Sequence, residues 1–416
     1  MKIATKALCH ALEIASMVIE GRNTVPILAT ARFQSSAVRT GIHVSTSNLD
    51  QFLAIELEQA TGDAVFDVAL PAPARLERLL RIAGDEIDMT TSQSKDEKDD
   101  RTSVDIKGGG LAATISALPG EDHPVYSLPV ASDTFQATLG HEALDMILRV
   151  SGAMSAEETR YYLNGVYLHH VDGWTYQAVA TDRHRLYTGT IELPDAVNPI
   201  AKHSNAGSGV IIPKSAIKLL RRLRSRIPAD QPLRLTIGHG INGATNGAEK
   251  DLAKSGGSTN AASFALNVSG IPVTLTTKLI DGTFPDYVRV IPQHNPDNHQ
   301  IVFKRRDLAG ALDAIGAGLL ERSKAVKLTF DPAGKLAVSA KWIHFSVDAR
   351  VEIPASVSEQ HREPFEIGYN GKYLRSLIDA TTGEDLVINV ADPGSPGSIV
   401  DPTADGFRAV LMPMRI

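Results

Sequence analysis

Asp182 and His184 lie two residues apart in the run ATDRHRL (residues 180–186). In a strand this spacing places both side chains on one face, where a carboxylate and an imidazole could form an acid–base pair. The sequence has no G-x-S-x-G turn or other activated serine that would complete a hydrolase. We therefore keep a hydrolase that uses Asp182 and His184 only as a weak alternative.

Other patterns that mark catalytic or cofactor sites are absent from the sequence. It has no P-loop, no G-x-G-x-x-G opening a helix and no histidine or carboxylate spacing typical of a metal site. Cys9 is the only cysteine, so an intrachain disulfide and a thiolate cluster are excluded. We expect no cofactor, no metal and no catalytic residue, which favours a binding protein over an enzyme.

A predicted helix over residues 214–223 has one apolar face and one basic face. Its basic residues follow at i, i+4, i+7 and i+8: Lys214, Lys218, Arg221 and Arg222. Two equivalent predicted helices carry Arg75, Arg78 and Arg81, and Lys372 and Arg375. A basic face is most often only solvated. Its repetition in a chain of net charge −6 nevertheless favours contact with a phosphate backbone, without reading of base sequence.

These helices belong to a two-part pattern that occurs three times. Each part is an apolar triplet at i, i+3 and i+4, which marks one face of a helix. The paired triplets begin at Leu8 and Leu76, at Leu144 and Ala216, and at Leu308 and Leu374, with separations of 68, 72 and 66 residues. Self-similarity over such long intervals predicts repeated domains.

Runs with strand character lie between the two helices of each repeat and resume after the second helix. They cover residues 31–58, 165–192 and 326–352, and then 86–89, 233–237 and 385–390. The pattern predicts α+β domains with two helices on antiparallel sheet, at residues 1–127, 128–293 and 294–416. Residues 91–103 are expected to form a hairpin tip or loop. Residues 238–263, rich in Gly, Asn, Ala and Ser, are expected to be an insertion without regular structure.

Composition indicates a soluble cytoplasmic protein. Apolar residues make up 43% and charged residues 22% of the 416 residues, enough for several globular cores. His10 and Glu13 interrupt the apolar N-terminus, so an amphipathic helix is favoured over a signal peptide. No stretch has the uncharged apolar length that a membrane span needs, and we expect no membrane association.

Several stretches together resemble the bacterial DNA polymerase III beta sliding clamp. They span all three repeats in the family's order: TVPIL (24–28), LPGED (118–122), RYYLNG (160–165), ATDRHRL (180–186), LIDGTFPDY (279–287) and MPMRI (412–416). The resemblance implies a head-to-tail homodimeric ring with helices toward the central hole and sheets outside. It implies a processivity factor that encircles double-stranded DNA. Its implied partners are the DNA polymerase III alpha subunit, the delta subunit of the clamp loader, and other polymerases and repair proteins with clamp-binding motifs.

Site residues are carried over by motif. The resemblance implies DNA contact at Arg22, Tyr161 and Tyr162, and helix register adds Arg75, Lys214 and Arg221, with Lys218 and Arg222 on the same basic face. It places a partner-peptide pocket between the second and third repeats. The pocket residues are Leu163, Thr181, Arg183, His184, Leu186, Pro285, Val290, Val410 and Met412.

Arg183 is a departure from the family, which usually has glycine at this position. We expect the arginine to add bulk and charge and to lose access to positive φ. A specialised or accessory clamp with altered partner selectivity is therefore the alternative to a principal replicative clamp.

Overall fold

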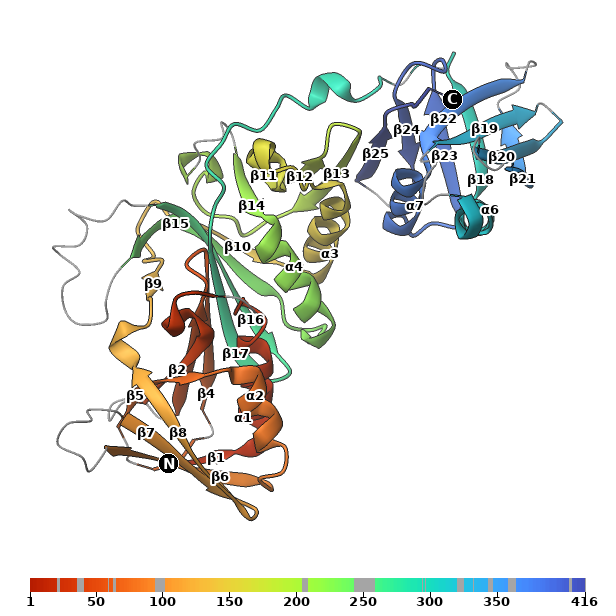
Figure 1. Ribbon diagram of the computed structural model, residues 1–416. Coiled ribbons are helices and arrows are strands. Elements are labelled where there is room, and N and C mark those ends of the chain that lie inside the picture. Colours follow the sequence, from red (N-terminus) through yellow and green to blue (C-terminus); the bar gives the residue numbers. More distant parts are fainter. Residues whose placement is uncertain are drawn as a thin grey trace. The chain divides into compact units, whose positions relative to one another are not determined.

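The computed structural model describes residues 1–20, 23–35, 41–58, 60–62, 65–93, 102–203, 209–242, 259–293, 295, 297–319, 325–331, 333–342, 347–357, 364–403 and 406–415. The chain forms two compact units. Unit 1 comprises residues 1–141, 193–204 and 215–281, and unit 2 comprises residues 142–192, 205–214 and 282–416. Each unit is built on one large antiparallel sheet (Figure 1).

The sheet of unit 1 has the strand order β1-β6-β7-β8-β5-β2-β3-β4-β17-β16-β15-β10, and β9 pairs with β15. Its strands are β1 (Lys2–Ala4), β2 (Thr30–Gln34), β3 (Ile42–Ser47), β4 (Gln51–Leu57), β5 (Asp67–Pro71), β6 (Glu86–Gln93), β7 (Thr102–Gly108), β8 (Leu111–Pro119), β9 (Tyr126–Ser127), β10 (Phe135–Leu139), β15 (Leu233–Asn242), β16 (Thr259–Val268) and β17 (Ile271–Lys278).

The sheet of unit 2 has the order β14-β11-β12-β13-β25-β24-β23-β18-β21-β20-β19-β22. Its strands are β11 (Gly165–Asp172), β12 (Thr175–Thr181), β13 (Arg185–Glu192), β14 (Gly209–Pro213), β18 (His299–Lys304), β19 (Ala325–Asp331), β20 (Lys335–Trp342), β21 (Val347–Val357), β22 (Phe365–Asn370), β23 (Asp385–Val390), β24 (Gly397–Val400) and β25 (Phe407–Leu411). The predicted α+β class with antiparallel sheet is confirmed.

All six predicted helices form, because each apolar triplet supplies a face for burial against sheet. They are α1 (Thr5–Ala15), α2 (Pro73–Leu80), α3 (His141–Val150), α4 (Lys214–Leu223), α6 (Arg305–Leu319) and α7 (Gly371–Ala380). Leu8, Leu144, Ala216, Leu308 and Leu374 are each 0% exposed. Short 3₁₀ turns are η1 (Pro26–Ala29), η2 (Gly120–Asp122), η3 (Ser151–Ala153), η4 (Glu158–Leu163), η5 (Ile200–His203), η6 (Arg224–Arg226) and η7 (Val288–Val290).

The three predicted strand runs become three equivalent meanders: β2-β3-β4, β11-β12-β13 and β19-β20-β21. The last strand of the first meander pairs with β17, and the last strand of the second pairs with β25. These pairings join neighbouring repeats within each unit. The predicted domain boundaries near residues 127 and 293 stay a prediction.

The expectation of an unstructured insertion over residues 238–263 is wrong at both ends. β15 continues to Asn242, β16 begins at Thr259, and the two strands pair from Gly240 and Thr259 inward. Small residues are required here, since a Cβ at Gly240 would overlap the Tyr126 hydroxyl and Ala261 is fully buried. Low strand propensity is thus overridden by close packing. Residues 243–258 lie outside the described residues. Of the loop expected over residues 91–103, residues 94–101 also lie outside them. The expectation is wrong at its two ends, because residues 91–93 belong to β6 and residues 102–103 to β7, and these strands pair up to Gln93 and Thr102.

Candidate partner-binding and nucleic-acid-binding sites

The turn between β12 and β13 holds the pair that could have been catalytic. Asp182 Oδ1 accepts hydrogen bonds from the backbone N–H groups of His184 and Arg185, each at 3.0 Å. Its Oδ2 pairs with Arg185 Nε at 3.0 Å. The carboxylate is therefore occupied in forming the turn, and the imidazole of His184 instead stacks on Tyr373, with ring centroids 5.9 Å apart. This geometry gives Asp182 a structural role.

Arg183 adopts φ 75°, so the expectation that it loses access to positive φ is wrong. A left-handed conformation costs a residue with a Cβ about 1–2 kcal/mol. The cost is offset locally, because the Arg183 N–H donates to Thr181 Oγ1 at 3.0 Å and Asp182 holds the next two N–H groups. The Arg183 side chain is half exposed and lies 3.9 Å from Glu157.

Unit 1 contains the same turn between β3 and β4. Leu49 has φ 74°, its N–H donates to Ser47 Oγ at 2.9 Å, and Asn48 Oδ1 accepts from the N–H groups of Asp50 and Gln51. The flanking register is also equivalent, since the residue after this turn, Phe52, pairs with Thr276 on β17, as Leu186 pairs with Val410 on β25.

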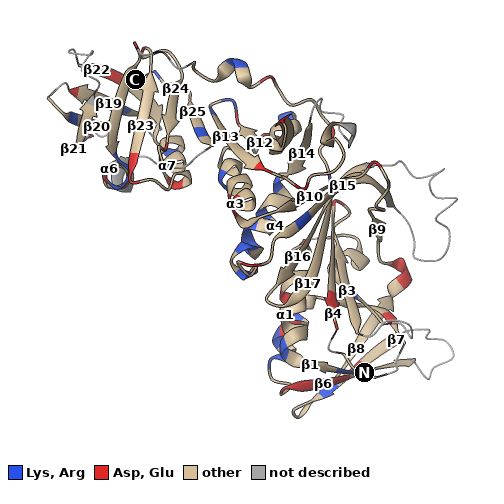
Figure 2. Ribbon diagram, turned by 180° about the vertical axis from the view of Figure 1, so that it is seen from behind, with Lys and Arg blue, Asp and Glu red and all other residues tan. Residues whose placement is uncertain are grey.

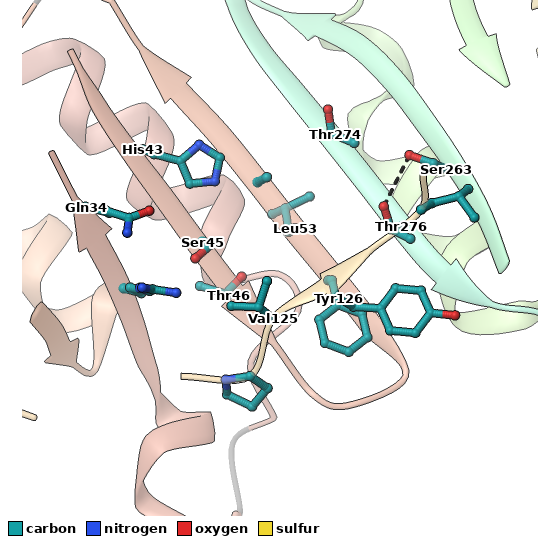
Figure 3. Close-up of a pocket in the computed structure, with 15 residues that line it drawn as sticks. Gln34, His43, Ser45, Thr46, Leu53, Val125, Tyr126, Ser263, Thr274 and Thr276 are labelled. Carbon is teal, nitrogen blue, oxygen red and sulfur yellow. Dashed lines mark hydrogen bonds between the residues drawn. The ribbon is translucent and has the colours of Figure 1, made fainter. Parts of the chain in front are cut away.

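The two sheet junctions, where β4 pairs with β17 in unit 1 and β13 pairs with β25 in unit 2, differ in the side chains that fill them. In unit 1 the aromatic rings of Phe52 and Tyr126 stack at 4.8 Å. The remaining hollow, of about 280 Å³, is lined partly by polar residues that include Gln34, His43 and Ser45 (Figure 3). In unit 2 the position of Phe52 is held by the smaller Leu186. The unit 1 junction is therefore partly filled by its own side chains.

Five of the predicted pocket residues meet at the β12-β13-β25 face of unit 2. Leu186 pairs with Thr181 on one side and with Val410 on the other. The Met412 N–H donates to the carbonyl of His184 at 2.9 Å, which places the end of β25 beside the turn. Leu186 and Val410 are buried on paired strands, whereas Met412 is 40% exposed. Buried apolar side chains close to an exposed flexible thioether suit contact with a hydrophobic anchor.

Pro285 and Val290 lie on the segment 282–291, which is held on β11 of the same sheet. Phe284 stacks on Tyr167 at 4.7 Å, and the Tyr287 hydroxyl lies 2.9 Å from His169 Nε2. Burial raises the pKa of Tyr287 to about 12 and lowers the pKa of His169.

Pro285 is exposed and Val290 is 48% exposed, so both side chains are accessible on this segment.

Leu163 ends η4 and is 2% exposed, with its carbonyl accepting from the N–H of Ser155 at 3.0 Å. In the same turn Tyr161 is 54% exposed and meets Tyr162 edge to face at 5.9 Å. Leu163 therefore holds the η4 turn in place, and the two tyrosines form the accessible surface of the turn.

Sequence reasoning missed Tyr373, Arg185 and Ser376. Arg185 lies over the Tyr373 ring at 4.7 Å and donates to Ser376 Oγ at 2.8 Å. Together with His184 they form an aromatic and polar group beside the β12-β13 turn, to which α7 contributes Tyr373 and Ser376. The sequence held a partial indication of Tyr373 and Ser376, because they lie three residues apart on the face of α7 next to the apolar triplet.

The predicted basic residues lie on accessible helix faces, with exceptions. Lys218, Arg221 and Arg222 of α4 and Arg75 of α2 are exposed. Figure 2 shows Lys and Arg positions along α4. Lys214 is half-buried, and its Nζ donates to the carbonyl of Ser155 at 3.0 Å.

Two further basic positions contribute less. Arg375 pairs with Asp313 at 2.5 Å and with Asp379 at 3.1 Å, so its charge is largely neutralised. Arg22 lies outside the described residues.

The described residues include neither a metal-binding cluster nor a membrane-spanning helix. No group of three or more His, Cys, Asp or Glu residues in them is arranged to hold a metal ion. Nor does any helix in the part of the chain that the structure describes combine the length and apolar character needed to cross a membrane.

Comparison with known proteins agrees with these features. The family models for the DNA polymerase III beta subunit match at residues 140–286 (central domain) and 288–415 (C-terminal domain). The beta sliding clamp of Caulobacter vibrioides is 32% identical over 100% of both chains, and that of Pseudomonas putida is 28% identical over 100% of this chain and 99% of the relative.

Solved structures give the same result. The sliding clamp of Caulobacter crescentus matches with a TM-score of 0.79 at 29% identity, and the Bartonella birtlesii clamp bound to griselimycin matches with 0.79 at 28%. Each comparison covers 100% of this chain and 99% of the other. The chain therefore belongs to the bacterial beta sliding clamp family, the beta subunit of DNA polymerase III.

Proposed function

We propose that the chain encircles duplex DNA as a homodimeric ring and tethers partner proteins through the β12-β13-β25 face of unit 2. Processivity then comes from topology, with no catalytic residue of its own. The observation that carries the proposal is the meeting of Thr181, His184, Leu186, Val410 and Met412 at one sheet junction. A buried apolar floor with accessible margins fits the hydrophobic anchors of short linear motifs.

The partners we propose are the alpha subunit of DNA polymerase III and the delta subunit of the clamp loader. Other polymerases and repair proteins with clamp-binding motifs would use the same face in turn.

Contact with DNA is proposed for the basic face of α4 and for Arg75, Tyr161 and Tyr162. Lys218, Arg221 and Arg222 are exposed at positions that a duplex backbone could approach without a fixed register. Such diffuse phosphate contacts permit sliding, since no base sequence is preferred. Replacing the three α4 cations with alanine should lower DNA affinity. It should also reduce the slope of log K against log salt by about 0.9 for each phosphate that is no longer neutralised.

Strand edges support the ring. Within each chain, β17 pairs with β4 and β25 pairs with β13. By their positions in the repeats, the two strands that correspond to these and have no such partner are β8 and β21. Over residues 111–117 and 347–353 each of them has one hydrogen-bonded neighbour among the described strands, β7 and β20 respectively. Unpaired edges template further pairing, so β21 of one protomer would pair with β8 of its partner, twice in a closed dimer.

The dimer can be tested on the apolar side of β8. Ile115→Lys should convert the dimer to a monomer in light scattering, because Ile115 is only partly buried within one chain and would lie in the contact. Ser116→Lys, an exposed position on the opposite face of the strand, is the matched control. A dimer that withstands Ile115→Lys would count against this interface.

The tethering function is tested with a fluorescent peptide that carries the clamp-binding motif of the host's polymerase alpha subunit. Met412→Ala should weaken binding about tenfold or more, as expected for a central hydrophobic contact. Val171→Ala, which changes a side chain 52% exposed on the same sheet, should leave the affinity unchanged. Retention of the wild type on circular DNA and its loss after linearisation would test the ring in parallel.

Arg183 distinguishes a principal clamp from a specialised one. Its exposed guanidinium stands at the pocket margin, 3.9 Å from Glu157. If the chain is a specialised clamp, Arg183→Gly should restore binding of standard replicase peptides that the wild type rejects. If the wild type already binds these peptides with ordinary strength, the hypothesis of a specialised clamp fails.

A further inference from the structure

The outer face of unit 2 continues beyond the proposed peptide pocket. Side chains alternate along a strand, so Leu186, Thr188 and Thr190 share one face of β13. On β25, Val410 shares that face with Arg408, and the register pairs Thr188 with Arg408. The pocket floor and this second stretch are therefore one continuous surface.

A hollow of about 420 Å³ occupies that second stretch. Its floor includes Gln177, Thr188, Thr190 and Arg408, and its wall is formed by Val288 and Ile291 of the segment that carries Pro285 and Val290. At about 3.4 Å per residue, Thr190 lies about 14 Å along β13 from Leu186. An extended peptide anchored at the pocket would reach the hollow with residues two to four positions from its anchor.

The chemistry of the hollow favours an anionic side chain. Arg408 is exposed, and its guanidinium makes no ion pair or hydrogen bond with another described residue. The neighbouring groups that face outward are neutral hydroxyls and an amide, with the Thr190 hydroxyl bonded to Gln177 at 3.4 Å. Asp401 also borders the hollow, but its carboxylate is 2% exposed and accepts the backbone N–H groups of Thr382, Gly383 and Thr403.

We propose that this hollow is a second subsite for partner peptides, which receives an aspartate or glutamate in the sequence flanking the clamp-binding motif and pairs it with Arg408. The proposal rests on the proposed tethering function. Charge complementarity and continuity with the pocket both point to this occupant. Partners with an acidic flank would then be preferred over partners that share the motif alone.

The test uses the full-length protein and fluorescent peptides that carry the motif with four flanking residues on each side. One peptide has glutamate on the N-terminal flank, one has it on the C-terminal flank, and glutamine replaces it in the matched pair. We expect the wild type to prefer the glutamate peptide about threefold on one flank, the range of an exposed ion pair, with the preference shrinking as salt rises.

Arg408→Gln should abolish this preference, and Arg408→Glu should reverse it toward a lysine flank. Arg289→Gln is the matched control, because Arg289 is 84% exposed on the same segment, pairs with Asp286 and does not line the hollow. Equal binding of all flanks by the wild type, or a preference that persists in Arg408→Gln, would overturn the subsite. Failure of the motif alone to bind would instead refute the tethering function.

Discussion

Asp182 provides the sharpest test of how the proposed pocket is built. Its Oδ1 holds two backbone N–H groups and its Oδ2 pairs with Arg185 at 3.0 Å, with only 13% and 12% of the two side chains exposed. Asp182→Asn keeps an acceptor for the turn and loses the ion pair. Asp182→Ala loses both and leaves Arg185 without its carboxylate, although Ser376 still accepts from it.

The equivalent turn in unit 1 supports treating the hydrogen bonds of the turn and the ion pair with Arg185 as separate contributions of Asp182. There Asn48 Oδ1 accepts from Asp50 N at 3.2 Å and from Gln51 N at 2.8 Å, so an amide suffices to form the turn. Loss of one partly buried charged hydrogen bond costs about 1–2 kcal/mol. Loss of all three, with a guanidinium left behind, should cost about 3–4 kcal/mol.

We expect Asp182→Asn to lower the melting temperature of unit 2 by about 3–6 °C and Asp182→Ala by about 9–12 °C, at roughly 3 °C per kcal/mol. Differential scanning calorimetry measures the transitions, and hydrogen exchange at the turn locates the change. Asn48→Asp is the control, because Gln51 offers no cation where unit 2 has Arg185, and it should change stability by less than about 0.5 kcal/mol.

If Asp182→Asn destabilises as much as Asp182→Ala, the backbone hydrogen bonds are not what the carboxylate contributes. Peptide binding by Asp182→Asn should persist, because the turn and its neighbours stay in place. A hydrolytic activity lost in this variant would revive the alternative of an enzyme.

Three further predictions concern His169, Gly240 and Tyr373. Burial lowers the pKa of His169. The contribution of His169 to stability is therefore present at pH values above the ordinary histidine pKa, and it is lost as pH falls through the pKa of the folded state. Hydrogen exchange next to Tyr287 should accelerate on acidification, and His169→Phe should abolish this pH dependence. Gly240→Ala should destabilise unit 1 by about 2–4 kcal/mol in urea unfolding, and Tyr126→Ala should reduce the penalty if the clash with that ring is its cause. Tyr373→Ala should weaken motif-peptide binding about fivefold in anisotropy, and unchanged affinity would exclude its ring from the binding margin.

The sequence by itself determined the repeated elements. Apolar triplets at i, i+3 and i+4 specified all six helices, and alternating runs specified the three meanders, because these periods reflect local geometry and the need to bury one face. The proposed pocket residues of the β12-β13 turn and of β25 and its end were predicted from sequence only through resemblance to a family. Periodicity alone could not distinguish Leu186 or Val410 from ordinary core.

Only the tertiary structure decided what depends on partners distant in sequence. Gly240 lies in a strand because Tyr126 packs against it. Arg408 becomes a candidate recognition residue only when β25 pairs with β13 and places it beside Thr188. Local propensity acts within a few residues, whereas these features arise from strand pairing and close packing across more than a hundred residues, which no local pattern encodes.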